Sequence, residues 1–211
     1  MKRLLLAFLA LTWASAASAQ CVGVGGINSV PQVGVSCLSE PTAPSYAATG
    51  TGIALVAAAT DVACITGSAT KIVRLQGIRV SGTATPTALS TAVLLTKHAS
   101  ADTLGTPAVT TALPTPYSLD TANPTVSATT TAYTANPTIN DAAPGIIDGA
   151  LLNFGLTTAA NAPLHFDYYN RLYAEAPTLR GVAQQVCVNL NAVTVTGGLM
   201  TVEFRWTESP Q

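Results

Sequence analysis

The last part of the chain, residues 178–207, constrains the fold most, because two alternating runs meet there at Gly197-Gly198. Alternation of apolar and other side chains is typical of a strand with one buried and one solvent-exposed face. The predicted inward residues of the two runs are Val186, Val188, Leu190, Met200, Val202, Phe204 and Trp206. Cys187, Asn189 and Asn191 are predicted to point the opposite way. A Gly-Gly pair tolerates the positive φ of a tight turn, so the pattern predicts a β-hairpin.

A hairpin cannot bury its apolar face alone, so the rest of the chain has to supply a second layer. Further strands are predicted over residues 51–58, 61–66, 71–80, 89–96, 126–133, 149–157 and 164–168. In the third of these, the apolar alternation changes phase at Gln76-Gly77, which indicates a β-bulge. No segment combines a 3.6-residue apolar period with helix caps. We therefore expect an all-β fold, an antiparallel β-sandwich resembling a jelly roll, with about eight to ten short strands.

The beginning of the chain has the features of an export signal. Lys2 and Arg3 precede a short apolar run, and Ala17-Ser18-Ala19 is typical of a cleavage site. The run is too short to span a membrane. The predicted organisation is a signal peptide over residues 1–19, a Gly- and Pro-rich arm over 20–45 and a β-sandwich domain over 46–211. The arm is either docked on a domain or a flexible leader. We expect an exported protein in the periplasm, at the cell surface or outside the cell.

Low charge limits the classes of partner. Charged residues make up 9% of the chain and the formal net charge is −1, which becomes about −3 if Lys2 and Arg3 leave with the signal. The sequence contains no basic patch for nucleic-acid phosphates and no polybasic segment for an anionic membrane. A neutral, threonine-rich surface is poorly protected against self-association. We expect either a homo-oligomer or a monomer with an unusually neutral surface.

The four cysteines, Cys21, Cys37, Cys64 and Cys187, are an even number in a chain expected to enter an oxidising compartment. Three pairings are possible, and we favour Cys21–Cys37 and Cys64–Cys187. The first would staple the N-terminal arm, and the second would join an early strand to the C-terminal region. The spacings fit no usual zinc pattern, so we expect no metal centre and no cofactor.

The sequence contains no recognisable set of catalytic residues. The chain has no GxSxG motif, and a serine or cysteine triad would have to use His98 or His165. His98 is interpreted as a solvated loop residue. His165 and Asp167 share a strand face and could form part of a hydrolase or metal site, although a hydrogen-bonded pair is the simpler interpretation. Asn140, Asp141 and Asp148 lie in a Gly/Pro loop that could bind Ca²⁺ or form a plain polar turn.

An aromatic cluster offers a possible binding surface. Tyr168, Tyr169, Arg171 and Tyr173 lie within DYYNRLY. Aromatic rings with polar neighbours suit sugar faces, and Tyr and Arg are equally suited to protein interfaces. The cluster could also be simple packing at the edge of the fold.

Three segments of the chain resemble small β-rich proteins of bacteriophage and prophage virions: ATDVACITGSATKIVRLQGIRVSGTA, TAYTANPTIND and the C-terminal LRGVAQQVCVNLN…GGLMTVEFRWTE. The resemblance covers residues 46–208 and implies a surface or decoration protein without enzymatic activity. An export signal and four cysteines depart from that pattern. The function we predict is a non-enzymatic, exported, self-assembling structural or interaction protein. The alternative is an extracellular carbohydrate- or cell-surface-binding module.

Overall fold

The computed structural model describes residues 43–103, 115–156, 162–169 and 176–211, and residues 43–211 form one compact unit. Within these residues the secondary structure consists of strands, without helices, so the all-β prediction is confirmed. The described segments contain no helix that is long and apolar enough to span a membrane. The strands are β1 (Ser45–Ala54), β2 (Ala59–Thr66), β3 (Lys71–Ala84), β4 (Leu89–His98), β5 (Thr115–Ser118), β6 (Thr129–Ala132), β7 (Gly145–Leu156), β8 (Leu164–Asp167), β9 (Thr178–Arg180), β10 (Gln185–Val193) and β11 (Leu199–Pro210).

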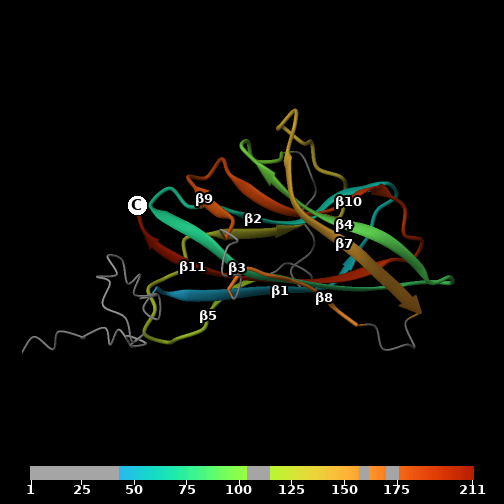
Figure 1. Ribbon diagram of the computed structural model, residues 1–211, viewed down its shortest axis with the longest axis horizontal. Coiled ribbons are helices and arrows are strands. Elements are labelled where there is room, and N and C mark those ends of the chain that lie inside the picture. Colours follow the sequence, from blue (N-terminus) through green and yellow to red (C-terminus); the bar gives the residue numbers. More distant parts are fainter. Residues whose placement is uncertain (1–42, 104–114, 157–161, 170–175) are drawn as a thin grey trace, which may run out of the picture. The chain divides into compact units, whose positions relative to one another are not determined.

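The eleven strands form one continuous mixed sheet in the order β5-β1-β11-β3-β7-β4-β10-β2-β6, with β8 and β9 also paired to β3. Figure 1 shows β1, β3, β8 and β11 on one side and β2, β4, β7 and β10 on the other. Strand β7 joins the two sides, because it pairs in parallel with β3 at Gly155 and Leu156 and antiparallel with β4. The sheet is therefore nearly barrel-shaped, and the predicted antiparallel sandwich or jelly roll is not confirmed.

The predicted C-terminal hairpin is wrong. Strand β10 pairs with β2 and β4, whereas β11 pairs with β1 and β3. A turn does form at the predicted glycines, where the Gly198 N–H donates to the Val195 carbonyl at 3.0 Å. Asn191 and Ala192, near the end of β10, have positive φ, and the side chain of Val195 that follows is buried. Alternation identifies strands, and it does not identify their partners.

Gly197 shows why glycine is required in this connection. Its φ is +56°, and a Cβ added there would lie 2.6 Å from the carbonyl oxygen of Thr85. The Thr85 N–H donates to Thr196 at 3.2 Å, and the Leu55 N–H donates to Gly198 at 2.9 Å. The turn after β10 is thereby held against the ends of β1 and β3.

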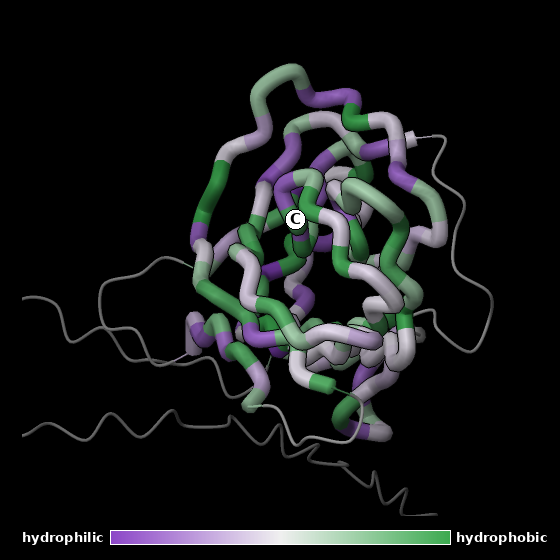
Figure 2. The backbone as a smooth tube through the Cα atoms, turned by 90° about the vertical axis from the view of Figure 1, so that its right-hand side faces the viewer, coloured by the Kyte–Doolittle hydropathy of each residue, from purple (hydrophilic) through white to green (hydrophobic). Residues whose placement is uncertain are grey.

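The core lies inside the curved sheet, and its side chains follow the predicted alternation. All seven predicted inward residues of the C-terminal strands are fully buried: Val186, Val188, Leu190, Met200, Val202, Phe204 and Trp206. Seen at right angles to the first view, the chain winds around this interior (Figure 2). The predicted bulge is also confirmed, because Arg205 pairs with Gly77 and Trp206 with Leu75, leaving Gln76 without a partner in the ladder.

A buried carboxylate fixes the segment before β6. Glu208 accepts hydrogen bonds from the backbone N–H groups of Ser127 and Ala128 at 2.9–3.1 Å and from the Trp206 indole at 3.1 Å. Tyr46 stacks on Trp206 with ring centroids 5.9 Å apart, and its hydroxyl donates to the Pro124 carbonyl at 2.8 Å. Burial, and second the charge of Glu208, raise the pKa of Tyr46. This cluster therefore serves the fold by tying the segment before β6 to β1 and β11.

Candidate functional site

The polar side chains that gather most tightly lie on the outer face of β2, β4 and β10. Cys64 and Cys187 are directly opposite each other in the β2–β10 ladder, and Thr96 is the partner of Cys187 on β4. Because side chains alternate along a strand, these residues point away from the main core. The face is nevertheless buried, contrary to the prediction that the Cys187 side of β10 is exposed to solvent.

The segment after β4 and the loop before β7 cover this face. The Ala99 N–H donates to Asp141 at 2.7 Å, and the Asn140 amide donates to the Ala101 carbonyl at 2.6 Å. A backbone bridge joins Thr103 to Thr138. These contacts place the carboxylate of Asp102 over the sheet.

The predicted disulfide between Cys64 and Cys187 is present, with the Cα atoms 4.1 Å apart. It packs with Tyr133 in a small apolar cluster separate from the main core. Both sulfur atoms lie 4.0 Å from Oδ2 of Asp102. A disulfide sulfur carries no proton, so these are packing contacts. The cysteines Cys21 and Cys37 lie outside the described residues.

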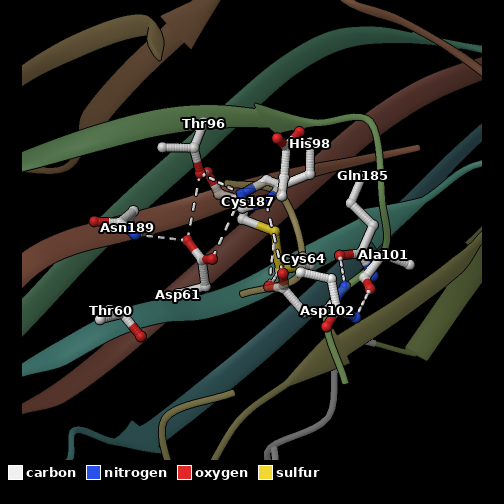
Figure 3. Close-up of polar contacts among 12 residues, drawn as sticks. Thr60, Asp61, Cys64, Thr96, His98, Ala101, Asp102, Gln185, Cys187 and Asn189 are labelled. Atoms are coloured by element: carbon white, nitrogen blue, oxygen red, sulfur yellow. Dashed lines mark hydrogen bonds and ion pairs between the residues drawn. A yellow bond between two sulfur atoms is a disulfide. The ribbon is translucent and has the colours of Figure 1, made fainter. Parts of the chain in front are cut away.

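His98 stands between two carboxylates (Figure 3). Its Nε2 is 3.5 Å from Oδ2 of Asp61, and its Nδ1 is 3.5 Å from Oδ1 of Asp102. All three side chains are 0% exposed. The interpretation of His98 as a solvated loop residue is wrong, because the loop that follows β4 folds back over the ring.

Hydrogen bonds from neighbouring strands orient this group. The Asn189 amide donates to Oδ1 of Asp61 at 2.7 Å, and the Thr96 hydroxyl donates to the same oxygen at 3.3 Å. Nε2 of His98 lies 3.0 Å from the Thr96 hydroxyl oxygen. The Asp102 N–H donates to the side-chain oxygen of Gln185 at 2.9 Å.

Electrostatics at the site reflect burial and crowded negative charge. Burial, followed by the charge of Asp61, raises the pKa of Asp102 to about 7. Burial, followed by the charges of Asp102 and Asp61, raises the pKa of Tyr133 to about 12. In contrast, hydrogen bonds from the Ala99 and Ala143 N–H groups lower the pKa of Asp141. The cluster therefore disfavours two full negative charges and favours a cation or a proton among its members.

The chemistry open to the cluster is limited by access. A hydroxyl, an imidazole and a carboxylate follow one another in Thr96, His98 and Asp102, which is the order of a nucleophilic triad. A substrate would have to reach the Thr96 oxygen, yet Thr96 is 4% exposed and His98 is 0% exposed. The arrangement suits holding a proton or a metal ion better than attacking a substrate.

The predicted aromatic cluster is not a single surface. Tyr168 is buried in the main core, whereas Tyr169 is 74% exposed. Arg171 and Tyr173 lie outside the described residues. A platform that combines Tyr168 and Tyr169 is therefore wrong, because consecutive residues at the end of β8 point to opposite sides.

The other sequence candidates have local roles. His165 and Asp167 are exposed on β8, and Asp167 accepts a hydrogen bond from the Tyr169 N–H at 3.0 Å. Asn140 and Asp141 hold the segment over His98, and Asp148 belongs to β7. Asn136 also acts in the fold, because its side chain accepts from the Thr60 N–H at the start of β2 and donates to the Ala58 carbonyl just before it.

Sequence analysis missed Asp61, His98 and Asp102 as a group. One signal was available, since Asp61 is the only charged residue in β2. The decisive factor, the segment that folds over the outer face, has no local sequence signature.

No protein-family model, curated protein or solved structure matches this chain. The resemblance to virion surface proteins therefore stays a prediction that rests on the three sequence segments given above.

Proposed function

We propose that this is a non-enzymatic, exported structural or interaction protein that self-associates, and that strand β7 is the surface through which it does so. The observation that carries the proposal is the pairing of β7. Its ladder with β4 extends from Gly145 to Phe154, whereas its ladder with β3 contains only Gly155 and Leu156.

Most of the second edge of β7 is consequently open among the described residues. An open edge presents N–H and C=O groups that can pair with another strand. In Figure 1, β7 runs as a long arrow along the outside of the sheet. A second copy of β7 is a suitable partner, because two identical edges can pair about a two-fold axis.

Side chains next to this edge favour association. Leu151 is 71% exposed and Ile146 is 65% exposed. Natural edge strands are usually protected by Lys, Pro or inward charges. Strand β7 has no Lys or Pro, and Asp148 is its single charged residue. A bulge at Ile147 interrupts the β4 ladder near the start of β7, so residues 149–154 are the regular stretch available for pairing.

Two further observations support the proposal. The charged fraction of 9% leaves little repulsion between copies. The Cys64–Cys187 disulfide is consistent with export, because disulfides persist mainly in oxidising compartments. The burial of Thr96, His98 and Asp102 supports a role without catalysis.

The test is the oligomeric state of the purified full chain by size-exclusion chromatography with light scattering. We expect an oligomer whose dissociation constant rises at least about tenfold in Leu151→Lys, because a charge beside the edge disfavours pairing. Val182→Lys is the matched control, since Val182 is also exposed, at 60%, but lies outside the strands. A monomer at all concentrations, or equal weakening by both variants, would refute the proposal.

A carbohydrate-binding role remains the second candidate. Its support is the exposed ring of Tyr169, now without Tyr168 beside it. Glycan-array binding that is lost in Tyr169→Ala would favour this function, and a blank array would remove it.

A further inference from the structure

Three buried polar atoms in the described part of the chain have no hydrogen-bond partner and belong to one cluster. They are Oδ2 of Asp61, Nδ1 of His98 and Oδ1 of Asp102. Burying such atoms without a partner is costly, so each one calls for an explanation. Their side chains are fully buried and face one another (Figure 3).

The hydrogen-bond network indicates which nitrogen of His98 carries the lone pair. The Thr96 hydroxyl has one proton, which it can donate to Oδ1 of Asp61 at 3.3 Å or to the Cys187 carbonyl at 3.5 Å. Its oxygen can then accept a bond from Nε2–H of His98 at 3.0 Å. In a neutral imidazole the other nitrogen is unprotonated. In the neutral tautomer that carries its proton on Nε2, Nδ1 directs its lone pair at the carboxylate of Asp102.

Two lone pairs that face each other are stabilised by a cation between them, and the distance between the two atoms can be compared with that expected for a shared proton and for a metal ion. A shared proton would bring nitrogen and oxygen to about 2.7–2.9 Å. Two ligand atoms at about 2.0–2.1 Å from a tetrahedral zinc ion lie about 3.3 Å apart. The Nδ1–Oδ1 distance of 3.5 Å between His98 and Asp102 is close to the second value.

Charge balance leads to the same conclusion. Within the described residues, the basic side chain at ion-pair distance from Asp61 and Asp102 is His98. Lys97, the next basic residue along the chain, instead donates to the Thr178 carbonyl at 2.9 Å. With neutral His98 and both carboxylates ionised, the cluster carries two buried negative charges, which a divalent cation would neutralise.

We propose that Asp61, His98 and Asp102 form a binding site for a divalent transition-metal ion of the zinc class. One ligand atom from each of these residues, together with Sγ of Cys187, lies within 4.8 Å of the others. The sulfur is held in the disulfide, so three protein ligands remain and a fourth position is open to water. An imidazole with carboxylates suits zinc better than calcium or magnesium, which prefer oxygen ligands alone.

The ion would act as a structural link. Asp61 belongs to β2 and His98 to β4, while Asp102 comes from the covering segment. Asn189 and Thr96 would supply the outer hydrogen bonds that orient Asp61, as is usual around metal ligands. Because the site is buried, the ion would enter as the covering segment closes during folding.

The test refolds the full chain with Zn²⁺, removes loose metal on a desalting column and measures zinc by mass spectrometry. We expect one equivalent per chain, slow release to a chelator and a higher melting temperature than the metal-free protein. Refolding with Co²⁺ should give the visible absorption of a four-coordinate site. Asp102→Asn keeps the shape of the side chain and should reduce affinity at least about tenfold. His165→Asn, which changes the exposed histidine of β8, should leave binding unchanged.

Should Asp102→Asn fail to fold, Asp61→Asn provides the same comparison. The proposal is overturned if the wild-type protein retains no zinc after refolding. It is overturned equally if Asp102→Asn and Asp61→Asn bind as tightly as the wild type, or if binding is lost in His165→Asn instead.

Discussion

Removing the Cys64–Cys187 disulfide should lower the free energy of unfolding by about 3–5 kcal/mol. The bridge joins residues separated by 123 positions, so it closes a loop that contains most of the folded unit. The chain-entropy relation gives about 5 kcal/mol for a loop of this length at 25 °C, and native disulfides commonly contribute about 2–5 kcal/mol. Burial of both cysteines adds a smaller packing loss when they become alanine.

The assay is urea unfolding of the wild type and of the Cys64→Ala/Cys187→Ala double variant, followed by fluorescence of buried Trp206. The slope of the unfolding free energy against urea concentration separates the chain-entropy contribution of the bridge from the loss of packing. If the bridge acts on the unfolded chain, the slope should increase in the variant, because an uncrosslinked chain exposes more surface. A simple packing defect lowers the midpoint and leaves the slope unchanged.

A loss below about 1 kcal/mol would refute the entropic argument, since no loop of this length could then be constrained in the unfolded wild type. A large loss with an unchanged slope would assign the effect to packing around Tyr133 instead.

Two further predictions concern the polar contacts that hold the covering segments. Glu208→Gln should lower the free energy of unfolding in urea by about 2–4 kcal/mol, because two buried donors and one partly buried donor lose a charged acceptor. Glu203→Gln, on the outer face of β11, should cost less than about 1 kcal/mol. Equal costs of the two variants would contradict this prediction. Because the pKa of Asp141 is lowered from its ordinary value of 3.8, its ionised form stabilises the fold above that pH, and this contribution is lost as the pH falls through the lower folded pKa. Asp141→Ala should therefore be less stable than the wild type at pH 7, and the gap should narrow below about pH 4; a gap that is constant with pH would refute the assignment.

Local features of the fold could be predicted because they depend on residues near in sequence. Alternation identified the inward residues from Met200 to Trp206, and a phase change at Gln76-Gly77 identified the bulge in β3. The strand predicted over residues 126–133 is confirmed by β6, Thr129–Ala132. In each case the side-chain period of two fixes which residues face the core.

Partner choice could not be predicted in the same way. The turn at Gly197-Gly198 suggested that β10 and β11 pair with each other, yet each pairs with strands from the first half of the chain. Both arrangements satisfy the same apolar pattern. The choice between them depends on how the whole sheet curves and closes, which is a property of all the strands together.

By itself, the sequence determined that the chain forms strands, which of their faces are apolar, and that Cys64 and Cys187 are suited to a disulfide. Only the tertiary structure decided that the second face of β10 is buried, because the segment carrying Asp102 folds over it. The group formed by Asp61, His98 and Asp102 exists for the same reason. Its members come from two strands and a covering segment that long-range contacts bring together. No short-range sequence pattern indicates that these three segments meet.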